Sequence, residues 1–106
     1  ASKTMTILLG KSDKVAWYMG EAGATAPTIE SLSQVEKAII DNRKVADASG
    51  VKGDFVVLVK PTSASNFKNF VDIMDELEIL KVKVRQIDDE NILDNEKAFM
   101  KEKGIL

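Results

Sequence analysis

The chain has 106 residues and a formal net charge of −2, with acidic and basic residues mixed along its length. A chain of this size forms one domain with its own hydrophobic core. Its weak, mixed charge creates no long-range field that would attract nucleic acid or an anionic membrane. It contains neither histidine nor cysteine, which excludes disulfides, thiol chemistry and His-activated nucleophiles and removes the softer metal ligands. We therefore expect a non-catalytic domain without a cofactor or a bound transition metal.

The N-terminal part of the chain predicts a β-hairpin over residues 4–19. Thr4–Leu9 and Val15–Met19 are rich in strand-forming residues, and the turn formers of Gly10–Lys14 separate them. Residues 20–28 follow with two glycines, three alanines and a proline. This segment is too small and too interrupted to pack as an element, so we predict a flexible connection there.

Trp17 and Tyr18 are consecutive residues of the second predicted strand. Consecutive strand residues point to opposite faces, so we expect one ring to pack inward and the other to be exposed or to lie in an interface. Aromatic side chains are enriched in interfaces, which makes both of them candidate partner-binding residues. The alternative is that both rings pack in the core.

The first helix is predicted to begin at Ser31. Ser31 and Gln34 have the spacing of a capping box. The helix then ends before Gly50. Its apolar stripe consists of Leu32, Val35, Ala38, Ile39 and Ala46.

Residues 55–87 predict a strand–helix–strand unit. Phe55–Lys60 is almost entirely apolar, as in a strand that is covered on both faces, and Pro61 ends it. Thr62 or Ser63 is positioned to cap the following helix. The residues expected on the buried face of this helix recur at spacings of three and four, and they are Phe67, Phe70, Val71, Met74 and Leu77.

The unit closes with a second strand over Lys81–Ile87, in which Val82 and Val84 alternate with charged residues. Crossovers of this kind are nearly always right-handed and join parallel strands. A polar loop then leads to a charged helix over residues 93–103, which Gly104 is positioned to terminate.

The predicted fold class is α/β (α+β), with a single domain over residues 1–106. We expect a small two-layer mixed sheet with helices mainly on one face, in the order ββαβαβ, followed by the C-terminal helix. Met5–Leu9 and Phe55–Val59 are apolar on both sides, so the second face of the sheet also needs a cover. That cover is either a second copy of the chain, which gives a homodimer, or the C-terminal helix through Leu93, Phe99 and Met100.

Other polar motifs favour ordinary structural roles. The carboxylates of Asp72, Asp75 and Glu76 fit the solvated face of a helix better than an acid–base pair. Asp88–Asn91 lacks the alternating ligands and central glycine of an EF-hand loop. Gly50–Gly53 matches a bare GxxG, which we interpret as a tight turn.

The order of these elements carries a family pattern. It comprises an apolar strand at Val56–Lys60, an aromatic residue opening the helix at Phe67, a Phe-Val-Asp core within Phe70–Asp75 and a second strand at Val82–Ile87. This pattern resembles the periplasmic domain of the ExbD/TolR family of biopolymer transport proteins.

Further runs resemble the Bacteroidetes-type ExbD branch of that family. They are Thr6–Gly10, Val15–Gly20, Lys60–Thr62, Lys68–Asn69 and Asp75–Glu76. Pro61–Thr62 replaces an Ala-Asp pair that is common in the proteobacterial branch.

The resemblance implies a periplasmic domain of an energy-transducing complex that is driven by the proton-motive force and supports outer-membrane import. Its partners would be an ExbB-like channel subunit, a TonB-like energy transducer and a second copy of itself. In the family, the proton-carrying aspartate belongs to a transmembrane helix that anchors the protein in the inner membrane. No apolar run in this chain approaches the roughly 20 residues that span a bilayer, so we expect that anchor upstream of the chain.

Partner binding is expected at a sheet edge, because a small mixed sheet has free backbone N–H and C=O groups there. We nominate the strand at Val82–Gln86, with Val82, Val84 and Gln86 as candidate partner-binding residues. The alternative function is a TolR-like or MotB-like module that binds peptidoglycan. It requires a polar groove with convergent donors, for which the sequence gives no clear signal.

Overall fold

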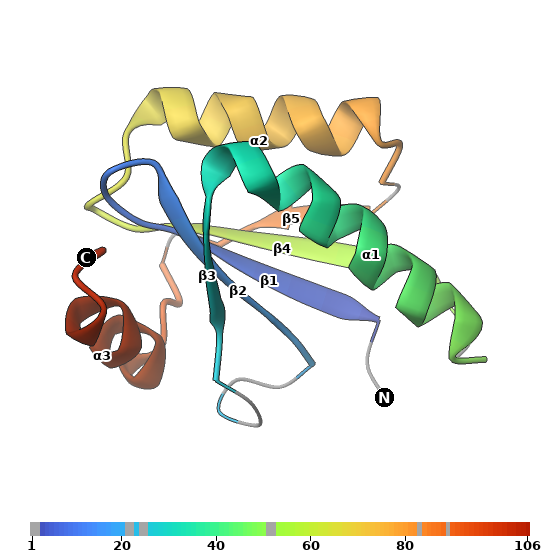
Figure 1. The fold of residues 1–106 in the computed structure, drawn as a ribbon, viewed down its shortest axis with the longest axis horizontal. Coiled ribbons are helices and arrows are strands. Elements are labelled where there is room, and N and C mark those ends of the chain that lie inside the picture. Colours follow the sequence, from blue (N-terminus) through green and yellow to red (C-terminus); the bar gives the residue numbers. More distant parts are fainter. Residues whose placement is uncertain (1–2, 21–22, 24–25, 51–52, 83, 89) are drawn as a thin grey trace.

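The computed structural model of the chain describes residues 3–20, 23, 26–50, 53–82, 84–88 and 90–106. These residues form a mixed five-stranded sheet in the order β3-β2-β1-β4-β5 with helices packed on it (Figure 1). Within these residues, no helix has both the length and the apolar character needed to cross a membrane. The elements are β1 (Thr4–Leu9), β2 (Lys14–Met19), β3 (Thr28–Ser31), the 3₁₀ helix η1 (Leu32–Gln34), α1 (Val35–Ala48), β4 (Val56–Pro61), α2 (Phe67–Ile79), β5 (Val84–Ile87) and α3 (Asp94–Glu102).

The sheet confirms the predicted α+β class and both predicted supersecondary units. β1 and β2 pair antiparallel as the expected hairpin. β4 pairs parallel with β1 on one side and with β5 on the other, so β4, α2 and β5 form the expected strand–helix–strand crossover. β1 and β4 are central strands, which accounts for their apolar residues on both faces.

β3 was not predicted, and it makes the order of the elements differ from the expected one. Thr28 pairs with Trp17 and Ser31 pairs with Lys14, antiparallel to β2. Ser31 precedes η1, but its side chain forms no cap hydrogen bond and instead lies 3.1 Å from the hydroxyl of Ser33. The capping box is therefore wrong. Of the predicted connection, Thr28 belongs to β3, whereas residues 21, 22, 24 and 25 lie outside the described residues.

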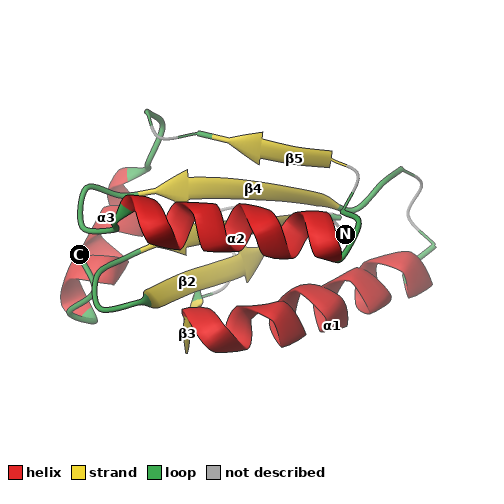
Figure 2. Cartoon of the chain, turned by 90° about the horizontal axis from the view of Figure 1, so that it is seen from above, coloured by secondary structure: helices red, strands yellow, loops and turns green. Residues whose placement is uncertain are grey.

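The main core lies between the sheet and the α1–α2 layer (Figures 1 and 2). Alternate residues of the central strands point into it, as the period of a strand requires. Burying each of these aliphatic side chains stabilises the fold by about 1.5–3 kcal/mol. The fully buried members include Met5, Ile7 and Leu9 from β1, Val57 and Val59 from β4, Val35 and Ile39 from α1, and Ile73 and Leu77 from α2.

α3 covers the opposite face of the sheet, which adds a partial third layer to the predicted two (Figures 1 and 2). Its Met100 is fully buried in a second cluster with Leu8, Ala16 and Tyr18. Phe99 packs against this cluster, whereas Leu93 is 44% exposed. Of the two predicted covers for the second sheet face, the C-terminal helix therefore packs on it. Phe99 and Met100 make this contact, and Leu93 contributes little.

The turn after α3 places the end of the chain against the β1–β2 hairpin. Gly104 has a φ of 75° just after the helix, as predicted for the residue that terminates it. The backbone N–H of Lys11 then donates to the carbonyl oxygen of Ile105 at 2.7 Å. A Cβ on Gly10 would lie 2.4 Å from that carbonyl oxygen, so only glycine allows this close approach.

The buried face of α2 differs from the predicted one. Ile73 and Leu77 are fully buried, whereas Phe67 is 78% exposed and Val71 is also exposed. Phe70 and Met74 are partly buried, at the margin of the core. The stripe that faces the sheet is Asn69, Ile73 and Leu77. Apolar residues surround most of this helix, so two stripes have helical spacing and only the contact with the sheet selects one of them.

The cap of α2 is also not the predicted one. Asn66 occupies the N-cap position, and its side-chain oxygen accepts from the backbone N–H of Asn69 at 2.8 Å. The hydroxyl of Thr62 instead donates to the carbonyl oxygen of Leu9, which joins the ends of β1 and β4. Pro61 is the last residue of β4, and Ser63 is an exposed residue of the loop.

Candidate partner-binding surfaces

β5 is one of the two edges of the sheet, and no strand among the described residues pairs with its outer side. The N–H of Asp88 donates to the carbonyl oxygen of Val59 in β4 at 2.9 Å. Because backbone groups alternate in direction along a strand, those of Gln86 also face β4, whereas those of Arg85 and Ile87 face outward. Such a row of outward N–H and C=O groups is a template for a further strand.

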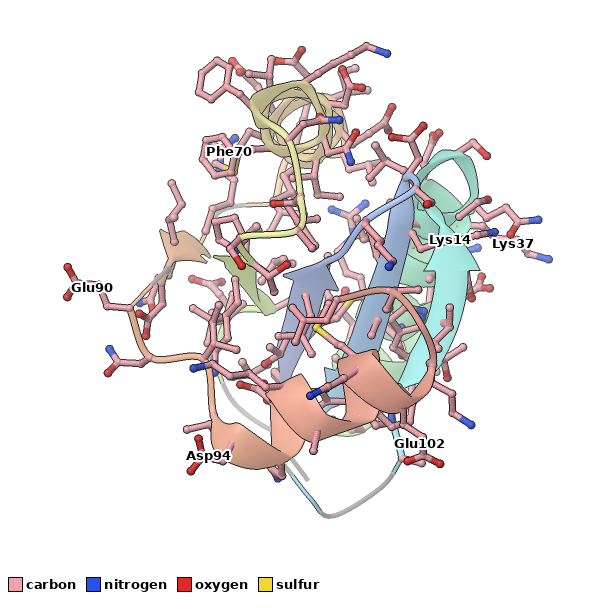
Figure 3. The ribbon with its side chains drawn as sticks, turned by 90° about the vertical axis from the view of Figure 1, so that its left-hand side faces the viewer. Lys14, Lys37, Phe70, Glu90, Asp94 and Glu102 are labelled. Atoms are coloured by element: carbon pink, nitrogen blue, oxygen red, sulfur yellow. The ribbon has the colours of Figure 1, made fainter. Side chains whose placement is uncertain are left out.

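Apolar side chains border this open edge on the helix side. Ile87 pairs with Val59, so it shares the sheet face on which α2 packs, and it is 52% exposed. α2 lies over the centre of the sheet and leaves β5 uncovered (Figure 2). Phe70 projects from the β5 side of α2 (Figure 3), and its ring centroid lies 6.2 Å from that of the exposed Phe67. We call Arg85, Ile87, Phe67 and Phe70 the edge surface.

The structure separates the three nominated residues of the last strand. Val82 precedes β5, is 3% exposed, and donates its N–H to the carbonyl oxygen of Leu77, so its assignment to partner binding is wrong. Gln86 is exposed on β5. Val84 pairs with Val56 at the start of β5, but its side chain lies outside the described part of the structure. The nominated strand is therefore an edge of the sheet, whereas Val82 belongs to the core.

Trp17 and Tyr18 lie on opposite faces of β2, as predicted, but both pack inward. Tyr18 is buried against α3, and Trp17 is partly buried at the margin of the main core. The indole N–H of Trp17 is enclosed and has no hydrogen-bond partner among the residues that the structure describes. β2 is an interior strand. Tyr18 is therefore a core residue, whereas Trp17 is only partly buried and lines an open cleft between β3 and α1.

A buried polar cluster fixes α3 to the sheet, and sequence reasoning missed it. Lys60 Nζ donates to Glu96 Oε1 at 2.9 Å and to the carbonyl oxygen of Asn91 at 3.1 Å. Tyr18 donates its hydroxyl to Glu96 Oε2 at 2.6 Å. Glu96 also accepts from the backbone N–H of Leu93 at 2.8 Å, which satisfies the first turn of the helix.

This cluster is structural in character. Lys60 and Glu96 are 5% and 2% exposed, so the ion pair is out of reach of a ligand. Burial, together with the hydrogen bond to Glu96, raises the pKa of Tyr18 to about 12. One signal was available in the sequence, because a lysine in a strand that is covered on both faces requires a buried partner. Nothing local identified Glu96 as that partner.

An open cleft of about 670 Å³ separates η1 and α1 from α2. Its rim is mainly acidic, and its floor is apolar. Burial, and then the neighbouring carboxylate of Glu36 on α1, raise the pKa of Glu76 above its usual range, and Asp72 and Asp75 add to the effect. The lining consists of Asp13, Ser31, Leu32, Ser33, Val35, Lys68, Asn69, Asp72, Ile73, Asp75, Glu76 and Ile79.

No group of three or more acidic side chains suited to a metal ion occurs within the described ranges. Comparisons with protein-family models, with curated proteins and with solved structures found no match to this chain.

Proposed function

We propose that this chain is the periplasmic domain of an ExbD-like subunit and that it binds an extended segment of a TonB-like energy transducer. The observation that supports this proposal most directly is the open edge of β5 beside the exposed side chains of Phe67 and Ile87 and the partly buried Phe70. The family part of the proposal is based on the resemblance in residue order. The binding mode is based on the geometry of the edge surface.

In this mode the partner segment adds a sixth strand to the sheet. The outward backbone groups of Arg85 and Ile87 provide main-chain hydrogen bonds to it, which give affinity without much sequence selectivity. Alternate side chains of the segment then face the helix side and contact Phe67, Phe70 and Ile87. Selectivity for apolar residues at those positions follows, because each Å² of apolar surface that is buried contributes about 25 cal/mol.

The wider assembly belongs to the same proposal. The domain lies in the periplasm, joined to the inner membrane by an upstream helix that contacts an ExbB-like channel subunit, and it has no catalytic role of its own. It forms a homodimer. Because α3 covers the second sheet face and β3 covers the outer edge of the hairpin, we assign the dimer contact to an edge strand instead of to that face or the hairpin.

The peptidoglycan-binding alternative has less support. The α1–α2 cleft does have hydroxyl and amide groups, but the carboxylates of Asp13, Asp72 and Glu76 also line it. They would repel the carboxylates of a peptidoglycan stem peptide. A pull-down with purified peptidoglycan tests this alternative directly.

The proposal is tested by substitution at the β5 edge. The probe is a set of synthetic peptides that covers the periplasmic linker of a TonB-like protein from the same genome, titrated into the ¹⁵N-labelled domain and followed by NMR. We expect shifts at Arg85 and Ile87. Ile87→Pro removes one outward N–H and leaves the bonds to β4 intact, so the Kd of the bound peptide should rise about tenfold or more. Gln86→Ala is the matched control, because it changes an exposed side chain on the same strand and retains the outward N–H groups.

Two results would overturn this assignment. One is equal peptide binding by Ile87→Pro and the unsubstituted domain. The other is retention of the domain on peptidoglycan with no binding to any linker peptide.

A further inference from the structure

The α1–α2 cleft contains an amide side chain without a partner. Asn69 is 4% exposed and lines the cleft. Its backbone N–H bonds to the Asn66 cap, but its side chain forms no hydrogen bond with any residue in the described ranges. Its amide atoms are not among the fully enclosed unpaired atoms of the described residues, so they are reached from the open cleft. The amide of Asn69 is therefore available to a ligand that enters the cleft.

The charges around this amide favour a cation. The carboxylates in the lining come from Asp13 in the hairpin turn and from Asp72, Asp75 and Glu76 on α2, and the one opposing lysine is Lys68. Burial is the largest cause of the raised pKa of Glu76, and repulsion from Glu36 on α1 and from Asp72 and Asp75 adds to it. A bound cation would relieve this repulsion.

The floor of the cleft suits an aliphatic stem. Leu32 and Val35 line it from the α1 side, and Ile73 and Ile79 line it from α2. Ile79 is 68% exposed at the rim. Lysine and arginine side chains combine a long aliphatic stem with a charged end, and they bury the stem along apolar surface of this kind.

We propose that this cleft binds a lysine or arginine side chain of a partner polypeptide. The ammonium or guanidinium group lies between Asp72 and Glu76 and donates to the side-chain oxygen of Asn69, while the stem lies along the apolar floor. A polypeptide fits better than a small free cation, because the cleft is open along one side and admits a side chain from a segment that lies across it.

This site is distinct from the edge surface. Phe70 projects from α2 toward β5 (Figure 3), whereas the cleft is on the side of α2 that faces η1 and α1. The inference goes beyond the proposed function and does not depend on it. Ile87→Pro should leave binding in the cleft unchanged, so the two hypotheses fail separately.

The test uses acetylated, amidated hexalysine and hexaarginine as probes. Each is titrated into the ¹⁵N-labelled domain at low salt, with the side-chain NH₂ resonance of Asn69 as the local reporter. We expect this resonance and the backbone signals of Ser33 and Ile73 to shift together. Loss of one hydrogen bond to a charged group weakens binding about tenfold or more, so we expect that loss for Asn69→Leu, which leaves the net charge unchanged.

Charge-matched double variants separate a specific site from general attraction. Asp72→Asn with Glu76→Gln should raise the Kd about tenfold or more. Glu78→Gln with Glu102→Gln removes the same charge at exposed positions outside the cleft and should change the Kd less than about twofold. If Asn69→Leu does not fold, these double variants decide the question.

Three outcomes would overturn the inference. The first is equal weakening by the two double variants, which would indicate non-specific electrostatic attraction. The second is probe binding that leaves the Asn69 side-chain resonance unmoved. The third is full displacement of hexalysine by spermidine at an equal concentration of amino groups, which would assign the cleft to small free cations.

Discussion

The pKa of the Tyr18 hydroxyl reports on the packing of the second sheet face. Burial raises its pKa from 10.0 to about 12, and the hydrogen bond that it donates to Glu96 adds to the effect. The folded state therefore favours the protonated phenol. This preference stabilises the fold fully below pH 10, the pKa of the unfolded state, and the stabilisation is lost as the pH rises from 10 through about 12.

We predict that Tyr18 titrates well above its ordinary range for as long as the domain is folded. The chain has a single tyrosine, so tyrosinate absorbance during an alkaline titration reports on this residue alone. Circular dichroism on the same samples shows whether ionisation precedes unfolding. Glu96→Gln should lower the midpoint, and a midpoint near 10 in a folded domain would contradict the environment described for Tyr18.

α2 illustrates how far an element can be predicted from its own residues. The helix, its place between two parallel strands and its C-terminal half were predictable, because apolar spacing and the strand runs on either side are local signals. The buried face was not, since Phe67 and Ile73 both lie on apolar stripes with helical spacing. Contact with β1 and β4, which local spacing does not encode, selects Ile73.

The same reasoning explains the other differences. β3 is only four residues long and has a single apolar residue, Ile29, and its pairing with β2 overrides a local helix-start signal. The polar cluster under α3 joins Glu96 to residues 36 and 78 positions away in the chain. The α1–α2 cleft likewise combines a hairpin turn, η1 and α2. The edge strand of the candidate site was predicted from its alternation, but the burial of Val82 depends on the turn that precedes β5.

A pair of truncations on α2 tests which stripe carries the stability of this helix. Ile73→Ala removes a fully buried side chain and should lower the free energy of unfolding by about 2–5 kcal/mol. Val71→Ala on the exposed side is the control and should change it by less than about 0.5 kcal/mol. Urea denaturation followed by the fluorescence of the single tryptophan provides the measurement. A larger loss for Val71→Ala than for Ile73→Ala would mean that the helix packs on the face that the apolar spacing predicts.

At the scale of the whole molecule, α3 decides whether the sheet is covered on its second face. Met100 and Ile105 pack on Leu8 and Ala16 and cover that face. The ion pair between Lys60 of β4 and Glu96 joins the helix to the sheet. Many buried ion pairs add little net stability, but removing one partner leaves an uncompensated charge. Substitution of Glu96 should therefore disturb the packing of α3 on the sheet most.

We predict that Glu96→Gln lowers the free energy of unfolding by about 3–5 kcal/mol, because Lys60 remains charged and buried without a carboxylate. This is a large part of the stability of a small domain. Glu102→Gln, at an exposed position on the same helix, is the control and should change it by less than about 0.5 kcal/mol. Adding Lys60→Met to Glu96→Gln removes the unpaired charge and should restore much of the lost free energy of unfolding.

Sedimentation should also show stronger self-association for the single Glu96 variant, since a loosened α3 exposes Leu8 and Met100. A Glu96→Gln domain that is as stable as Glu102→Gln and self-associates no more strongly would show that packing alone, and not the buried ion pair, holds α3 on the sheet.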